Sequence, residues 1–106
     1  MSSRIAAIET TATVTVYQIP GSQYPLKRPL TLEIERDEDR YIVSDPSTGV
    51  FHHDADLGAA LSGFLRIFIK EFEFLRENEK HLSTPLSAEL DRFHQLLLLK
   101  PGEASI

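Results

Sequence analysis

Residues 30–78 read LTLEIERDEDRYIVSDPSTGVFHHDADLGAALSGFLRIFIKEFEFLREN, and this stretch decides the fold of the 106-residue chain. Residues 30–36 alternate apolar and polar side chains, which predicts a strand with one buried face. Residues 41–44 and 50–53 are two further short strand-like runs, each reached through a tight turn. Because turns this short join antiparallel neighbours, the stretch predicts a three-stranded meander.

A long helix is expected after this meander. Asp56 is suited to cap it, since its carboxylate can accept a bond from a free N–H of the first turn. Residues 57–80 carry apolar side chains over roughly 220° of the helix circumference, more than the roughly 100° that one core face needs. The main stripe consists of Leu57, Leu61, Phe64, Phe68, Phe72 and Leu75. A helix of this kind needs cover from two directions.

The N-terminal region is predicted to add a fourth strand. Residues 11–17 alternate threonine with alanine and valine, which is typical of a half-buried strand. Residues 1–10 are expected to form a loose start. Residues 19–29 contain three prolines and one glycine, so we expect a loop there.

A second helix is predicted near the C-terminus. Thr84 is expected as its N-cap and Pro85 as its first residue, and Pro101-Gly102 is expected to end it. Its inward stripe would be Leu86, Leu90, Phe93 and Leu97. Residues 103–106 would form a tail. The predicted fold is α+β: a three- or four-stranded antiparallel sheet packed against one long helix, with a second C-terminal helix.

Length and composition limit the class of protein. A chain of 106 residues with 42% hydrophobic and 25% charged residues is expected to form one domain over residues 1–106. The sequence has no cysteine, so disulfides, thiol nucleophiles and thiolate metal sites are excluded. It also has no apolar run of the roughly 18 residues that cross a bilayer. We therefore expect a cytoplasmic protein with no membrane partner.

The negative charge is unevenly distributed. The net charge is −5, whereas residues 30–56 alone combine eight carboxylates with two arginines. An acidic region repels nucleic acid and favours a basic protein partner, so direct nucleic-acid binding is not expected. Charge that serves only solubility is the alternative interpretation.

Apolar side chains outside the main stripes predict association. Ile67 and Phe74 widen the apolar arc of the long helix, and leucines at 96–99 would point around the whole last turn of the second. We expect a small monomer to leave such residues exposed, so a homo-oligomer or another chain should cover Ile67, Phe74, Leu98 and Leu99. Half-exposed leucines in a monomer are the alternative.

Glu71 belongs with these predicted interface residues. It falls inside the apolar arc, where a lone carboxylate is costly to bury. It is expected either to pair with an arginine such as Arg36 or Arg40, or to meet a basic group of a partner.

No catalytic, cofactor or metal site is expected. His52, His53 and Asp54 carry the right ligand types, but neighbouring residues of a strand point to opposite faces. Gly58 and Gly63 lie inside the predicted long helix, where glycine costs about 1 kcal/mol each relative to alanine. Close approach of another backbone is one explanation for them.

Residues 41–46 (YIVSDP), Gly49-Val50 and residues 56–61 (DLGAAL) together resemble the N-terminal domain of HicB-like antitoxins. The resemblance covers residues 30–70. It implies an acidic, often oligomeric protein that masks a small basic RNA-cleaving toxin. Such antitoxins usually carry a DNA-binding module after this domain, whereas this chain has a single helix without a basic face.

The functional hypothesis is a non-enzymatic protein-interaction module, antitoxin-like by the resemblance above, that covers a basic protein partner. One alternative is a small metal-dependent hydrolase that uses His52, His53 and Asp54. The other is a structural homodimer without a separate ligand.

Overall fold

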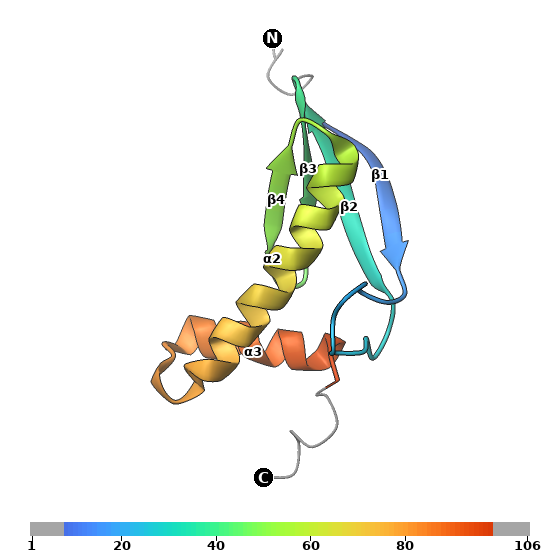
Figure 1. Cartoon of the computed structure of the whole chain (residues 1–106). Helices are drawn as coiled ribbons and strands as arrows, with labels where there is room; N and C mark the ends of the chain where they lie inside the picture. Colours follow the sequence, from blue (N-terminus) through green and yellow to red (C-terminus); the bar gives the residue numbers. More distant parts are fainter. Residues whose placement is uncertain (1–7, 99–106) are drawn as a thin grey trace.

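The computed structural model describes residues 8–98, with side chains from residue 12 onward, and contains a four-stranded antiparallel sheet and two helices (Figure 1). The strands are β1 (Ile8–Val16), β2 (Leu30–Asp37), β3 (Arg40–Ser44) and β4 (Phe51–Asp54), and they lie side by side in chain order. The helices are α2 (Leu57–Glu77) and α3 (Thr84–Leu96), with the short 3-10 helix η1 (Glu79–His81) between them. This architecture confirms the predicted α+β class.

The N-terminal strand is longer than predicted. β1 begins at Ile8, so the prediction of a loose start is wrong for residues 8–10, and residues 1–7 lie outside the described part. β1 pairs with β2 along its whole length, and a bulge interrupts the register between Thr10 and Ala12. Pairing with β2 supplies the hydrogen bonds that extend the strand, which the local sequence pattern does not reveal.

The β3–β4 turn is organised by a buried carboxylate. Asp45 is 3% exposed and accepts hydrogen bonds from the backbone N–H and the hydroxyl of both Ser47 and Thr48. Gly49 closes the turn with φ at 81°, a conformation that favours glycine. The predicted turn over residues 45–49 is therefore confirmed.

One face of the sheet is covered by α2. The register pairs Ile34 with Val43 and Val43 with His52, so these residues lie on the same face. α2 packs on β3 and β4. Residues buried on this face include Leu30, Leu32, Ile34 and Val43. Thr13, Thr31, Glu33, Ile42 and His53 lie on the opposite face.

α2 begins as predicted. The Asp56 carboxylate accepts from the backbone N–H of Ala59 at 2.8 Å, which confirms the cap. The helix ends at Glu77, three residues before the predicted end. Phe64, Phe68, Phe72 and Leu75 are fully buried, but Leu61 is half-buried and Leu57 is 37% exposed. The first turn of the stripe therefore lies at the edge of the core.

Gly63 makes room for the side chain of His52 and not for the backbone of another segment. It is buried in α2, and a Cβ at this position would overlap the imidazole of His52 on β4. The explanation from an approaching backbone is wrong, because a histidine ring occupies the space. Gly63 therefore allows α2 to lie close to β4.

α3 starts one residue earlier than predicted. Ser83 is the N-cap, its hydroxyl accepts from the N–H of Leu86 at 3.4 Å, and Thr84 is already helical. The helix packs on the C-terminal half of α2, with the rings of Phe68 and Phe93 4.8 Å apart. Leu86 at its start is 37% exposed and does not join the buried stripe.

The C-terminal leucines do not form a helical turn. α3 ends at Leu96, and Leu97 is extended and forms a bridge with Leu26 of the β1–β2 loop. The Lys27 N–H donates to the Leu96 carbonyl, and the Leu98 N–H donates to the Pro25 carbonyl. Leu96 and Leu97 are buried within the monomer, whereas Leu98 is 45% exposed and Leu99 lies outside the described residues.

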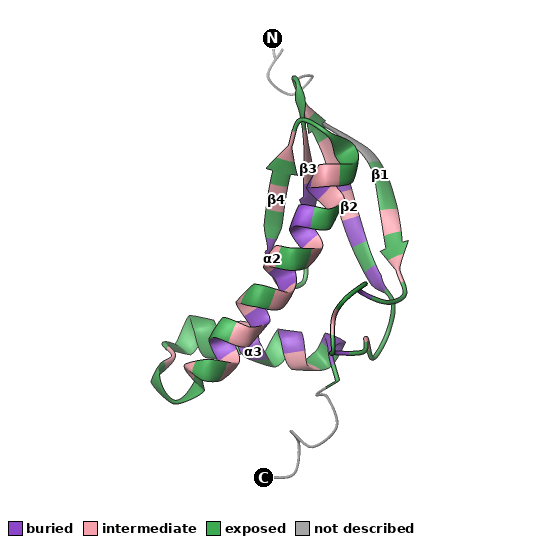
Figure 2. Ribbon diagram, in the orientation of Figure 1, coloured by how far each residue is buried: buried purple, intermediate pink, exposed green. Residues whose placement is uncertain are grey.

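The core extends along α2 well beyond the sheet. The N-terminal half of α2 lies over the strands, and its C-terminal half crosses α3 at the other end of the molecule (Figure 1). Buried residues occur along most of α2 and also mark β2 and the end of α3 (Figure 2). The two flanks of α2 beside this buried stripe are the places where surface sites can form.

Candidate functional site

One flank of α2 carries a mixed apolar and acidic surface. A hollow of about 280 Å³ lies where α2, α3 and the β3–β4 region meet. It is lined by Thr48, Gly49, Val50, Phe51, Ile67, Glu71 and Glu89. Phe74 lies one helical turn after Glu71 on the same side of α2. We call Phe51, Ile67, Glu71, Phe74 and Glu89 together the acidic α2 surface.

The aromatic side chains of this surface are unusually exposed. Phe51 is 60% exposed and Phe74 is 53% exposed, while Ile67 and Glu71 are half-buried. Three residues predicted as interface residues from helical spacing, Ile67, Glu71 and Phe74, therefore share one face. Clustered exposed apolar side chains beside polar ones are typical of interaction sites.

Two carboxyl groups meet inside this surface. Burial raises the pKa of the Glu89 carboxyl, and a hydrogen bond and charge repulsion from Glu71 raise it further, against an opposing effect of Arg92. Glu71 comes from α2 and Glu89 from α3, so the packing of the two helices brings them together. Two neighbouring carboxylates repel each other when both are ionised.

Glu71 does not make the expected contact with an arginine. Arg40 forms an ion pair with Asp37 at 3.3 Å. The guanidinium of Arg36 lies 5.7 Å from the ring centre of Tyr41. The pairing hypothesis is thus wrong for both arginines, and the alternative of a basic group from a partner remains open.

The two predicted leucines do not join this surface. Leu98 is 45% exposed, but its backbone is held by Pro25 and it does not line the hollow beside Glu71. Leu99 lies outside the described residues.

Sequence reasoning missed Phe51 and Glu89. Phe51 occupies an outward position of a short strand, and Glu89 is one of two acidic residues on α3, the other being Asp91. Neither has a local signal, because their contribution depends on how β4 and α3 pack beside α2.

The histidine cluster is divided between two faces of the sheet. His52 pairs with the buried Val43 and faces α2, whereas His53 pairs with Ile42 and lies on the opposite face. Their ring centres are 6.3 Å apart. Within the described part of the chain, no three histidine, cysteine, aspartate or glutamate side chains form a group that could hold a metal ion.

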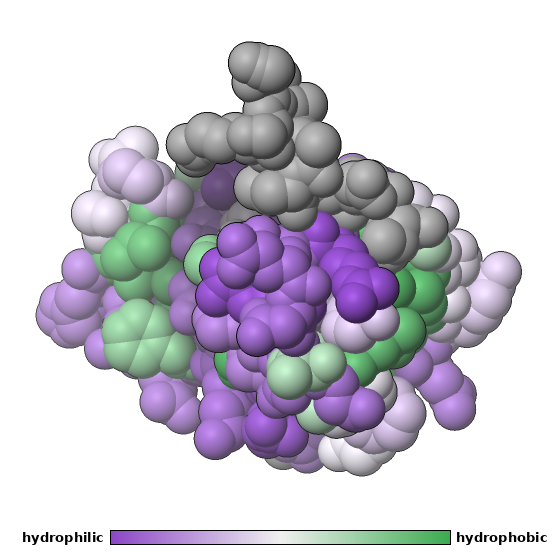
Figure 3. All heavy atoms as spheres, turned by 90° about the horizontal axis from the view of Figure 1, so that it is seen from above, coloured by the Kyte–Doolittle hydropathy of each residue, from purple (hydrophilic) through white to green (hydrophobic). Residues whose placement is uncertain are grey.

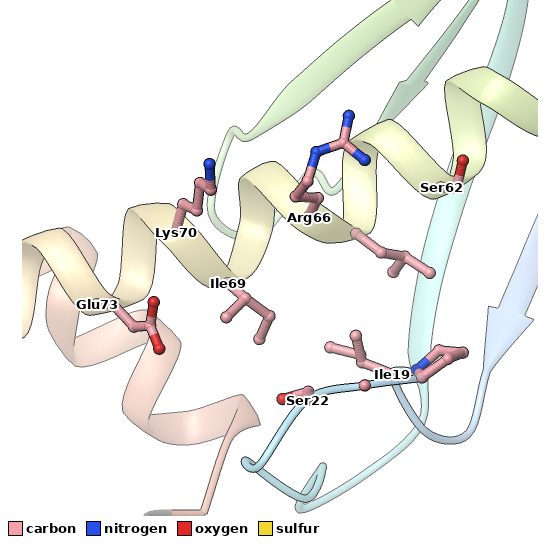
Figure 4. Close-up of a pocket in the computed structure, with 10 residues that line it drawn as sticks. Ile19, Ser22, Ser62, Arg66, Ile69, Lys70 and Glu73 are labelled. Carbon is pink, nitrogen blue, oxygen red and sulfur yellow. The ribbon is translucent and has the colours of Figure 1, made fainter.

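The opposite flank of α2 contains a second hollow, of about 450 Å³, between the helix and residues 19–22 (Figure 4). The side chains of Ile69 and Ile19 face each other across it, while Arg66 and Lys70 point away from the loop. Glu73 accepts a hydrogen bond from the Tyr24 hydroxyl at 3.1 Å. Glu73 is engaged by Tyr24, and Arg66 and Lys70 lie at the rim. The wall of this hollow is therefore mainly apolar.

Polar and apolar residues are also separated at the sheet end of the molecule. Seen from above the view of Figure 1, the centre is hydrophilic and hydrophobic residues gather on two sides of it (Figure 3). None of the helices formed by the described residues has the length and apolarity to cross a membrane.

Comparisons with known proteins place the chain in no family. No family model, no curated protein and no solved structure matches it.

Proposed function

We propose that this chain is a non-enzymatic protein-interaction module that binds a basic protein partner through the acidic α2 surface. The observation that carries the proposal is the pair of carboxyl groups, Glu71 and Glu89, in a hollow that Phe51 also lines, with the exposed Phe74 one helical turn after Glu71. Arg92 opposes the rise in the pKa of Glu89 but does not cancel it, so the charge of the pair is incompletely balanced. A basic side chain of a partner would balance it.

The chemistry of the surface suits a lysine or arginine beside apolar residues. A cation between Glu71 and Glu89 would remove their repulsion and form charge-assisted hydrogen bonds with both. Phe51 and Phe74 would contribute most of the apolar contact, since aromatic residues are frequent among the residues that dominate binding energy. Because such a cation favours the ionised form of Glu89, binding should release a proton near the pKa of Glu89.

The resemblance to HicB-like antitoxins supports one kind of partner. It implies that the chain masks a small basic protein, and an acidic surface with exposed aromatic residues is suited to that task. We propose an antitoxin-like role in the cytoplasm on this basis. The partner itself would be recognised by its positive charge and its apolar contact area.

Charge reversal on the acidic α2 surface tests the proposal. Tagged wild-type chain should capture a basic protein from a lysate of its native host, and the Glu71→Arg variant should lose it. Glu38→Arg makes the same change of charge at the exposed β2–β3 turn and should retain it. Circular dichroism and thermal unfolding would verify that both variants fold.

The outcomes of this capture are distinct. Loss with Glu71→Arg alone supports the assigned surface, and recovery of an acidic or neutral protein contradicts the proposed partner chemistry. If Glu38→Arg abolishes capture while Glu71→Arg does not, the acidic turn of the sheet is the binding site and the proposal is wrong.

A further inference from the structure

Among the residues that the structure describes, the sheet has two edge strands of very different length. β1 and β4 are the outer strands, and β1 spans nine residues while β4 spans four. A free edge exposes unpaired backbone N–H and C=O groups that can pair with another strand. The long β1 edge is therefore the stronger template for association.

The last five residues of β1 lack the features that usually protect an edge. The segment 12–16 reads ATVTV, without charge or proline, and the bulge between Thr10 and Ala12 lies before it. Natural edge strands are commonly blocked by charged residues, prolines, bulges or short length. β4 is short and carries Asp54, so it is protected in this way.

The α2 side of β1 is also incompletely covered. α2 packs on β3 and β4 rather than on β1, so Ala12 is exposed and Val14 and Val16 are half-buried. An added strand at this edge would extend the sheet beside these side chains. Both the backbone and the side chains of residues 12–16 thus favour a strand as the occupant.

We propose that a second copy of this chain occupies the edge, and that two β1 strands pair antiparallel about a two-fold axis at Val14. The bulge and the end of the strand limit the regular segment to residues 12–16, whose centre is Val14. This register places Thr13 opposite Thr15 of the second copy and Ala12 opposite its Val16. The two four-stranded sheets then form one continuous sheet.

The register is favoured because it keeps equivalent faces together. Directly opposed residues of antiparallel strands point to the same side, so the valines of both copies stay on the α2 side and the threonines on the other. Threonine pairs and valine pairs across strands are both favourable. The pairing segments are neutral, so two chains of net charge −5 can approach there without opposing like charges.

Dimerisation through β1 leaves the acidic α2 surface free. Phe51 of that surface lies on β4, at the other edge of the sheet. The dimer would therefore present two partner-binding surfaces at its outer ends. The inference does not depend on the proposed function, because it concerns the opposite edge.

The solution mass of the chain tests this inference. Light scattering and sedimentation should give twice the chain mass for the wild type. Thr13→Lys with Thr15→Lys places like charges directly opposite each other across the axis and should give the monomer mass. Thr31→Lys with Ser44→Lys adds the same charge to the same sheet face on inner strands, and this control should remain a dimer.

A mixing experiment separates disrupted pairing from disrupted folding. Thr13→Glu with Thr15→Glu should also be monomeric, and mixing it with the double lysine variant should restore a mass of two chains, because unlike charges then face each other. A monomeric wild type, a dimeric double lysine variant, or a mixture that stays monomeric would each overturn the proposal.

Discussion

Gly63 and His52 meet where α2 crosses β4, and their contact decides how closely the helix approaches the sheet. Alanine at position 63 should improve helix propensity by about 1 kcal/mol. Its methyl group, however, would overlap the His52 imidazole. Overpacking of this kind typically costs about 1–3 kcal/mol.

We therefore predict that the sign of Gly63→Ala depends on residue 52. In the wild-type background the substitution should lower the free energy of unfolding by up to about 2 kcal/mol, the overpacking cost less the gain in helix propensity. In a His52→Ala background the same substitution should raise it by about 1 kcal/mol, because the space is then vacant. Urea unfolding of the four proteins measures both effects, and equal effects in the two backgrounds would contradict the contact.

Glu89 predicts a pH dependence of stability. Its folded-state pKa is raised above 4.5, mainly by burial, so the folded state holds a proton over a range in which the unfolded state releases it. Stability contributed by this group is present below pH 4.5 and is lost as pH rises through the folded-state pKa. At neutral pH the ionised Glu89 therefore opposes folding.

Replacement by glutamine removes this titration. Glu89→Gln should be more stable than wild type at neutral pH by up to about 1 kcal/mol, since the pair is partly solvated. The advantage should shrink toward zero as the pH falls to 4.5. Chemical unfolding at several pH values measures it, and an advantage independent of pH would show that Glu89 is not the titrating group.

At the level of single elements, the N-terminus of α3 offers a direct test. Ser83 and Thr84 both have side chains that can cap a helix, and proline is common at the first helical position, which favours Thr84 from sequence alone. The structure instead uses the Ser83 hydroxyl, with proline at the second position. Which of the two hydroxyl residues caps the helix is thus decided by backbone conformation, since Ser83 is extended and Thr84 is helical.

Alanine substitutions should separate the two residues. Ser83→Ala should lower the free energy of unfolding by about 1 kcal/mol, because a free N–H of the first turn loses its acceptor. Thr84→Ala should change it by less than about 0.5 kcal/mol, as expected for an exposed helical position. Thermal unfolding of both variants would show the difference, and the reverse order would restore Thr84 as the cap.

Elements with a strong local pattern were predictable, and those that depend on distant contacts were not. The alternation of β2 and the Asp56 cap of α2 are local properties, and both are confirmed. The end of α3 is different, because Leu97 leaves the helix to pair with Leu26, far away in the sequence. Helical spacing placed Leu97 on the inward stripe, but it could not show that Leu97 is buried outside the helix, beside Leu26.

At the level of the whole molecule, the candidate site combines predictable and unpredictable parts. Ile67, Glu71 and Phe74 follow from the excess apolar arc of one helix, so their common face was visible in the sequence. Phe51 and Glu89 come from a strand and a second helix, and only tertiary packing brings them to the same surface. Helical periodicity thus predicted the α2 residues of the surface, but it did not predict the residues that β4 and α3 contribute.

The central claim is that a basic partner contacts the acidic α2 surface, and isoleucine methyl NMR tests it most directly. Ile67 lies on that surface, Ile69 lines the hollow on the other flank of α2, and Ile42 lies on the sheet face opposite α2. All three are half-buried, so they are matched reporters. Adding the captured basic protein should shift the Ile67 methyl signal and leave Ile69 and Ile42 in place. An unchanged Ile67 signal with a shifted Ile69 or Ile42 signal would contradict the account.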